Sequence, residues 1–284
     1  MLKSNKDKLV MQSAQGKIHS PTHRAAYRVN SKGHGQVLPS VGGICYNVKI
    51  GDSAMRLVGD HVEPGVSIKN DIEIENNALM ILSCIGNEAK VVSGEAKGAK
   101  GFVTGGHGGI EHTLIHFEQE DLEKMAINDN ILVICFGIGL EYEGYEDIHF
   151  MNIDPGLLEK IGVEETEGGL SLPVVTKVPA HLMGSGIGSP SAASGDYDIM
   201  TGDLEANEKY GVNDLKLGDL VLLEDCDNTF GRQYLKGSAS IGVVVHSNCI
   251  QSGHGPGICV IASSKSSRLK GRIDPKANIV NYLS

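Results

Sequence analysis

The chain has 284 residues and 40% hydrophobic content, which is enough for one large domain or two ordinary ones with a real core. Its 37 glycines, absence of tryptophan and 5% aromatic content favour a many-stranded β protein over a helical bundle. The net charge of −10 argues against duplex nucleic acid as a partner. Because no apolar run reaches about 18 residues, we expect a soluble, cytoplasmic protein that binds no membrane.

Charge is distributed unevenly along the chain. Residues 1–35 hold seven Lys/Arg against Asp7 alone, and residues 265–284 hold five against Asp274 alone, so the body between them is acidic. Basic tails and an acidic body attract each other in a salt-sensitive way. We therefore expect a homo-oligomer joined through basic terminal arms, the alternative being tails that are merely solvated. The N-terminal arm shows no sustained apolar period and should wrap rather than pack.

The first half of the chain is punctuated like a β-meander. Short apolar segments alternate with Gly/Asp/Pro turns from Val37 onward, and the continuous apolar run 78–85 has the length of a buried strand. Residues 88–103 form a predicted hairpin that resembles the KOW motif of small SH3-like barrels, through Val91, Gly94, Lys97, Gly98, Gly101 and Val103. The resemblance implies a hairpin within a barrel.

Helices are expected at only a few places. Residues 118–126 have helical composition with acids at their start, which suits the helix dipole. Asp154 precedes Pro155 and Gly156 and is a predicted N-cap for a short helix through Lys160. The acidic loop 164–169 is a candidate domain boundary.

The second half contains further apolar strands near residues 172–179, 220–223, 239–246 and 257–262. We predict a mostly β fold, built of barrel-like or sandwich modules with a few short helices. The predicted division is a basic arm (1–35), a first β-rich domain (36–168), a second β-rich domain (169–264) and a basic tail (265–284). The six cysteines lack metal-ligand spacing and are expected to be buried, reduced thiols.

Three histidines lie in glycine-rich settings. His107 sits in Gly-Gly-His-Gly-Gly, His181 precedes a Gly-Ser-Gly-Ile-Gly segment, and His254 sits in Gly-His-Gly-Pro-Gly. Glycine exposes an imidazole and lets backbone N–H groups converge on a ligand. Glu111 and His112 follow His107 closely, so nitrogen and carboxylate ligands coincide. The alternative is that these histidines are ordinary turn residues.

Carboxylates, a cation and a glycine loop add further candidates. Asp196 and Asp198 form an Asp-x-Asp pair that suits divalent cations, although such pairs also occur in ordinary loops. Arg232 could clamp an anionic substrate group or form a structural ion pair. Gly184 and Gly186 belong to a long small-residue loop, which is often functional. We assign Gly184, Gly186 and Arg232 to substrate binding, and no nucleotide cofactor is expected because the loop lacks a phosphate-binding fingerprint.

Several segments together resemble a known family. Gly-Gly-His-Gly-Gly-Ile-Glu-His, Pro-Ala-His-Leu-Met-Gly-Ser-Gly-Ile-Gly-Ser and Gly-Val-Val-Val-His with Gly-His-Gly-Pro-Gly are similar to the uncharacterised domain-of-unknown-function family 4438. That resemblance implies a mostly β protein. Gly108-Gly109 before Glu111, and Gly195-Asp196, also stand near the metal-site motifs of the acetamidase/formamidase family, although the Asn-x-Asp of that family is Ile-Glu-His here.

These observations lead to two functional hypotheses. The first is a metal-dependent hydrolase of a small amide or related acyl substrate, with Zn, Mn or Fe held by His107, His112, His181, Asp196 and Asp198. Glu111 or His254 would act as general base, and glycine-loop amides would stabilise the oxyanion. The second is a non-enzymatic oligomeric β-barrel module that binds a small ligand, a protein or single-stranded RNA.

Overall fold

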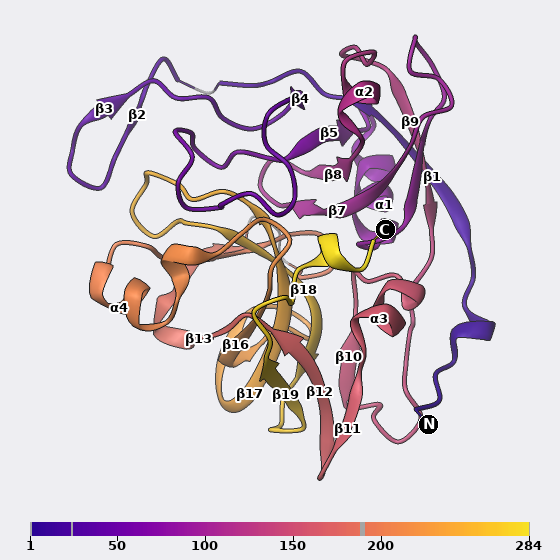
Figure 1. Cartoon of the computed structure of the whole chain (residues 1–284), viewed down its shortest axis with the longest axis vertical. Coiled ribbons are helices and arrows are strands. Elements are labelled where there is room, and N and C mark those ends of the chain that lie inside the picture. The colour runs from indigo at the N-terminus through magenta and orange to yellow at the C-terminus, as the bar shows by residue number, and fades with distance from the viewer. Residues whose placement is uncertain (1, 24, 188–190, 284) are drawn as a thin grey trace.

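The structure is a computed structural model that describes residues 2–23, 25–187 and 191–283 (Figure 1). Strands account for 38% of the chain and helices for 14%. The mostly β prediction is therefore confirmed. None of the helices in the described residues combines the length and apolar character needed to span a membrane.

The first sheet closes into a ring. Its order is β1-β9-β6-β7-β8-β5-β4, and β1 also pairs with β5, so six strands form a closed barrel with β4 attached. It occupies the upper half of the molecule in Figure 1. Its strands are β1 (Gln12–Ile18), β4 (Ile44–Cys45), β5 (Gly65–Lys69), β6 (Glu88–Val91), β7 (Lys100–His107), β8 (His112–His116) and β9 (Asn130–Cys135).

Alternation of side chains builds the barrel core. Buried and partly exposed residues alternate along β9, and the inward ones, Ile131 and Val133, are fully buried beside Val91 and Val103. The predicted 88–103 hairpin is present, because β6 pairs antiparallel with β7. The N-terminal arm, predicted to wrap, instead contributes β1, since its backbone hydrogen-bonds to both β9 and β5.

One predicted strand is a helix. Residues 78–82 of the apolar run 78–85 belong to α1 (Glu73–Leu82), so the strand prediction was wrong. Periodicity cannot separate a buried strand from a helix in so short a run. The helix is favoured by tertiary contacts, because Leu79 packs into the barrel and Asn76 hydrogen-bonds to the carbonyl of Glu111.

The second sheet is a half-barrel in the order β13-β16-β17-β18-β15-β14, with β10 paired to β18. The 14-residue β17 pairs with β16 on one side and β18 on the other. The sheet lies below the first in Figure 1. Its strands are β10 (Ile148–Phe150), β13 (Thr176–Pro179), β14 (Met183–Ile187), β15 (Tyr197–Ile199), β16 (Leu220–Asp227), β17 (Gln233–His246) and β18 (Gly257–Ser264).

Smaller elements complete the fold. A three-stranded sheet contains β11 (Glu164–Thr166), β12 (Gly169–Val174) and β19 (Leu269–Ile273), and β2 (Arg28–Val29) pairs with β3 (Gly35–Gln36). The remaining α-helices are α2 (Gln119–Leu122), α3 (Pro155–Ile161) and α4 (Leu204–Lys209), with 3-10 turns at Lys6–Lys8, Ala180–Leu182, Val212–Asp214 and Ile279–Asn281. Asp154 caps α3 by accepting hydrogen bonds from the backbone of Gly156 and Leu157, as predicted.

The basic ends pair with the acidic body of the same chain. Lys3 contacts Glu143 at 2.8 Å and Lys6 contacts Glu159 at 2.7 Å. Near the other end, Arg268 pairs with Asp147. Exposed pairs of this kind contribute little free energy each. The homo-oligomer and the four-part division of the chain both stay predictions.

The two sheets meet where β7 crosses β17. A Cβ added to Gly105 would lie 2.2 Å from Cγ1 of Val245, so only glycine permits this approach. Leu114, next to β7 in the barrel, belongs to the same apolar core as Val245 and Cys259 of the second sheet. The close approach brings the β7–β8 turn against the ends of β17 and β18.

We expect Gly105→Ala to lower the free energy of unfolding by about 1–3 kcal/mol, as overpacking of a filled core usually does. The measurement is urea denaturation followed by circular dichroism. Gly202→Ala is the matched control, because a Cβ at Gly202 meets no atom within 4 Å, and its effect should stay within about 0.5 kcal/mol. Equal stability of the two variants would contradict the proposed tight contact.

Candidate metal centre

Titratable side chains from both sheets gather at this junction. The barrel contributes the loop before β5 and the β7–β8 hairpin, and the second sheet contributes β15 and the β17–β18 connection. Cross-strand pairing sets His107 opposite His112, and His246 opposite Gly257. We call the assembly the His–carboxylate cluster; it comprises Asp60, His61, Glu63, His107, His112, Asp196, Asp198, His246, Cys249 and His254.

Four carboxylates of the cluster are nearly inaccessible to water. Asp60, Glu63, Asp196 and Asp198 have relative exposures of 1%, 3%, 5% and 4%. Within residues 2–23, 25–187 and 191–283, Arg28 is the only Lys or Arg in an ion pair with any of them, 2.7 Å from Asp60. Buried charges must be paired or bind a metal. The cluster therefore needs positive charge, from protonated imidazoles or from a cation.

Glu63 organises the barrel side of the cluster. Its Oε1 lies 2.6 Å from Nδ1 of His107, and its two oxygens lie 3.1 and 3.0 Å from Nδ1 of His112. Burial alone would raise the pKa of Glu63, but the charge of His112 and the hydrogen bonds from both histidines hold that pKa well below its usual range. Nδ1 of His107 is thus engaged, which leaves Nε2 as its candidate ligand atom.

His246 organises the opposite side. Its Nδ1 lies 2.8 Å from the carbonyl oxygen of Ser247, while Nε2 lies 2.8 Å from Oδ2 of Asp196 and 3.5 Å from Oδ1 of Asp198. Burial would lower the pKa of His246, but the two aspartates raise that pKa well above its ordinary value. The other oxygen of Asp196 accepts the backbone N–H of Gly108 at 2.7 Å, which joins the two sheets.

Asp198 connects His246 to two further histidines, His254 and His61. Its Oδ2 lies 2.9 Å from Nδ1 of His254 and 3.9 Å from Nε2 of His61. Burial would raise the pKa of Asp198, but hydrogen bonds from His246 and His254 hold it below its usual range. His61 has a positive φ of 54° and its Nδ1 lies 3.3 Å from Asp60, so the loop turns the other ring nitrogen toward Asp198.

Two sets of donors within the cluster could each hold an ion. They are His107, Asp196 and His246, all buried, and His61, Cys249 and His254. Within each set the ligand atoms lie within 4.8 Å of one another. This is close to the span of one ion with bonds of about 2.0–2.3 Å to N, O and S. The rings of His107 and His246 are stacked with centroids 4.3 Å apart.

A pocket of 530 Å³ opens beside the second set. Cys249 and His254 line it, together with His181 and the β2–β3 turn. The turn is tied down by the N–H of Ser31, which donates to the carbonyl of Ile250 at 3.0 Å. His254, whose side chain is 37% exposed, therefore stands between the cluster and the pocket.

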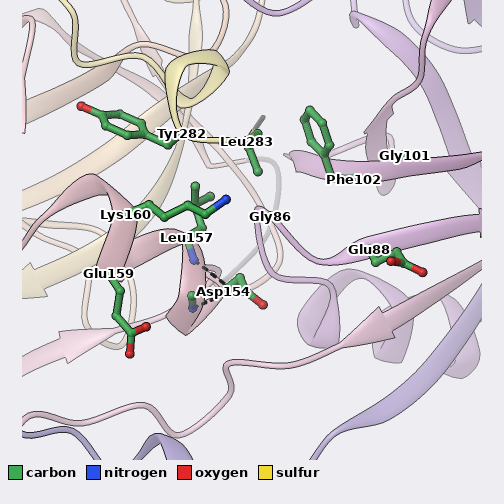
Figure 2. A pocket seen from close by; sticks show the side chains of 11 residues that line it. Gly86, Glu88, Gly101, Phe102, Asp154, Leu157, Glu159, Lys160, Tyr282 and Leu283 are labelled. Carbon is green, nitrogen blue, oxygen red and sulfur yellow. Dashed lines mark hydrogen bonds between the residues drawn. The ribbon is translucent and has the colours of Figure 1, made fainter.

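A larger hollow of 640 Å³ lies elsewhere, between α3 and the C-terminal residues (Figure 2). None of its lining residues belongs to the His–carboxylate cluster. In Figure 2 the carboxylate of Asp154 points at the backbone of α3, whose N-terminus it caps. The size of a pocket therefore does not identify the candidate site. The smaller pocket, of 530 Å³, is the one that adjoins the His–carboxylate cluster.

The structure brings together five of the predicted site residues. His107, His112, Asp196, Asp198 and His254 all belong to the cluster. The two nitrogens of His112, however, lie within hydrogen-bond distance of Glu63 and of His19. His112 is thus placed to support Glu63.

The other five predicted residues lie outside the cluster. The carboxylate of Glu111 pairs with Lys69 at 3.1 Å, and His181 is exposed and packs edge-on to Tyr210. Arg232 stacks on the ring of Tyr197, 4.4 Å from its centroid. Gly184 and Gly186 lie in β14, where a Cβ on Gly184 would come within 2.3 Å of the carbonyl oxygen of Gly253.

Sequence reasoning missed Glu63, His61, His246, Asp60 and Cys249. The signal for the first two was the Asp-His-Val-Glu-Pro-Gly segment from Asp60 to Gly65, which concentrates ionisable residues in a turn before a strand. For His246 it was a histidine at the end of a long apolar strand, a position where a polar side chain needs a buried partner.

A closed barrel joined to a half-barrel around buried histidines and carboxylates defines a β protein with candidate metal-binding groups. The domains described as "Domain of unknown function (DUF4438), N-terminal" and "C-terminal" match residues 27–159 and 160–283. The chain belongs to this family, as its sequence motifs predicted. It is similar to the solved structure titled "Crystal structure of TM1086", with 51% identity, 99% of each chain covered and a TM-score of 0.95. Among curated proteins none matches this chain.

Gly257→Ala should disturb the centre directly. The added Cβ would lie 2.1 Å from Nε2 of His246 and 2.2 Å from Oδ2 of Asp196, so both groups must move away from it. We expect the thermal unfolding temperature to fall, by an amount corresponding to roughly 1–3 kcal/mol. Gly202→Ala again serves as control, and an unchanged unfolding temperature in Gly257→Ala would show that the contact between the two groups is not tightly packed.

Proposed function

We propose that the chain is a metal-dependent hydrolase of a small amide or related acyl substrate, with a divalent ion bound by His107, Asp196 and His246. The observation that carries the proposal is the orientation of the imidazole rings of His107 and His246. Glu63 engages Nδ1 of His107 and the Ser247 carbonyl engages Nδ1 of His246. Metal-binding histidines characteristically use the second nitrogen in this way, which leaves Nε2 for the ion.

Charge supports the same conclusion. Asp196 and Asp198 both approach Nε2 of His246, at 2.8 and 3.5 Å, so two carboxylates share one imidazole. A divalent ion in this space would neutralise both and remove the need for an imidazolium. Imidazole with carboxylate suits Zn²⁺, Mn²⁺ or Fe²⁺.

The size and lining of the pocket are consistent with a small substrate. Its 530 Å³ suits a small molecule, and its lining combines apolar side chains such as Leu182 and Met200 with uncharged polar ones such as Asn30, Thr201, Asn248 and Gln251. A bound divalent ion supplies Lewis-acid polarisation of a carbonyl and activation of water. The residues of this chain would orient the substrate and hold the ion, with His254 on the wall of the pocket and Asp198 hydrogen-bonded to His254.

Metal content tests the proposed ligand set. Purified untagged protein loaded with Zn²⁺ and dialysed should retain at least one equivalent, measured by inductively coupled plasma mass spectrometry. Asp196→Asn should weaken binding at least 10-fold, since it removes a charged ligand that also fixes the hairpin through Gly108. Asp71→Asn, at an exposed residue paired with Lys17, should bind as the wild type does. Retention of full affinity in Asp196→Asn would contradict this ligand set.

Turnover tests the reaction class. Metal-loaded protein should release ammonia from formamide or acetamide, or hydrolyse p-nitrophenyl acetate, and a chelator should abolish the activity until metal is restored. Glu63→Gln should lower metal affinity or activity by about 10–100-fold, because it weakens the acceptor that orients His107.

Glu111→Gln provides the comparison with the base predicted from sequence. Since Glu111 pairs with Lys69 outside the cluster, this variant should keep wild-type activity. A strong loss in Glu111→Gln, with little change in Glu63→Gln, would overturn our assignment of the site. Tight metal binding without turnover of any of these substrates would instead favour the non-enzymatic module.

A further inference from the structure

We propose that the cluster binds two metal ions, the second held by His61, Cys249 and His254, with the carboxylate of Asp198 bridging them. This inference rests on the proposed function, since the first ion is the one bound by His107, Asp196 and His246. It specifies the centre as dinuclear and assigns His254 as a ligand in place of a general base.

The position of Asp198 is the main argument. Its Oδ1 faces the first set, 3.5 Å from Nε2 of His246. Its Oδ2 faces the second, 2.9 Å from Nδ1 of His254 and 3.9 Å from Nε2 of His61. A carboxylate whose two oxygens point at two separate donor sets is suited to bridge two ions, which in hydrolytic two-metal centres lie about 3.5–4 Å apart.

The histidine rings show that the two sets are close enough. The ring of His61 lies 5.0 Å from that of His246 and 5.7 Å from that of His107, between centroids. It lies 5.4 Å from the ring of His254 in its own set. Ions bound to these imidazoles would therefore be neighbours in one centre.

Neighbouring residues hold the donors of the second set in place. Asp60 lies 3.3 Å from Nδ1 of His61 and is itself paired with Arg28. In the first set, Glu63 occupies the corresponding place beside Nδ1 of His107, at 2.6 Å. Cys249 is 5% exposed, and its sulfur accepts the backbone N–H of Gln251 at 3.3 Å. One sulfur and two imidazole nitrogens favour Zn²⁺ or another thiophilic ion over Mg²⁺ or Ca²⁺.

Access distinguishes the two ions. The first set is buried throughout, whereas Cys249 and His254 line the 530 Å³ pocket. The second ion would thus face a substrate that enters the pocket, and the first ion would lie deeper in the protein. His181, on the wall of the same pocket, would contact the substrate and neither ion.

Titration of the metal-free full chain with Co²⁺ alone tests this proposal. We expect two equivalents to bind, and a thiolate-to-cobalt charge-transfer band in the near ultraviolet to develop with the second site. Cys249→Ser should lose the band and keep one equivalent. Cys135→Ser, at a buried cysteine of the barrel near Ser83, should behave as the wild type does.

Electron paramagnetic resonance of the same wild-type samples gives a measurement that needs no variant. Two bridged Co²⁺ ions should be magnetically coupled, so the signal per ion should fall as the second equivalent binds.

The outcomes separate this proposal from the preceding one. Binding of one equivalent without the band would overturn the second ion and leave the proposed hydrolase intact. Two equivalents without the band, or a band that persists in Cys249→Ser, would remove Cys249 from the ligands and overturn the proposed second set. Two uncoupled ions would overturn the bridge through Asp198. Absence of Co²⁺ binding would overturn both proposals.

Discussion

The structure depends on one electrostatic constraint, the burial of four carboxylates against a group of imidazoles where two β sheets meet. Asp60, Glu63, Asp196 and Asp198 are each at most 5% exposed, and a single arginine reaches them among the ion pairs of the described residues. Such charges are tolerated only when they are paired or bound to a metal. The junction can therefore be understood as a charged site around which the apolar cores are arranged.

Close backbone approach makes this arrangement sterically feasible. Gly105 lets β7 lie against Val245 of β17, and Gly257 leaves room for the contact between His246 and Asp196. Gly65, with φ of 69°, lets the loop that carries Glu63 enter β5 beside the carbonyl of Ile115. The high glycine content thus serves packing at the junction as well as turn formation.

The histidines differ in their hydrogen-bond partners although they lie together. His107 and His246 each use Nδ1 on an oxygen acceptor and present Nε2 to the interior. His112 lies within hydrogen-bond distance of Glu63 on one side and His19 on the other, and His254 links Asp198 to the pocket. The hydrogen-bond partner of each ring, more than its position in the sequence, decides whether it can ligate an ion.

The sequence by itself determined the mostly β class, the 88–103 hairpin, the Asp154 cap and the family. These features depend on the alternation of apolar and polar residues, on turn residues and on motifs, all of which lie within short segments of the chain. It also indicated His107 and His254 through their glycine-rich surroundings, and Asp196 and Asp198 through their Asp-x-Asp spacing. Only the tertiary structure decided that α1 replaces a predicted strand, and that Glu63, His61 and His246 join these residues while Glu111 and His181 do not. Those outcomes depend on contacts between segments up to nearly 200 residues apart, such as Val62 with Ser247, and no local pattern encodes them.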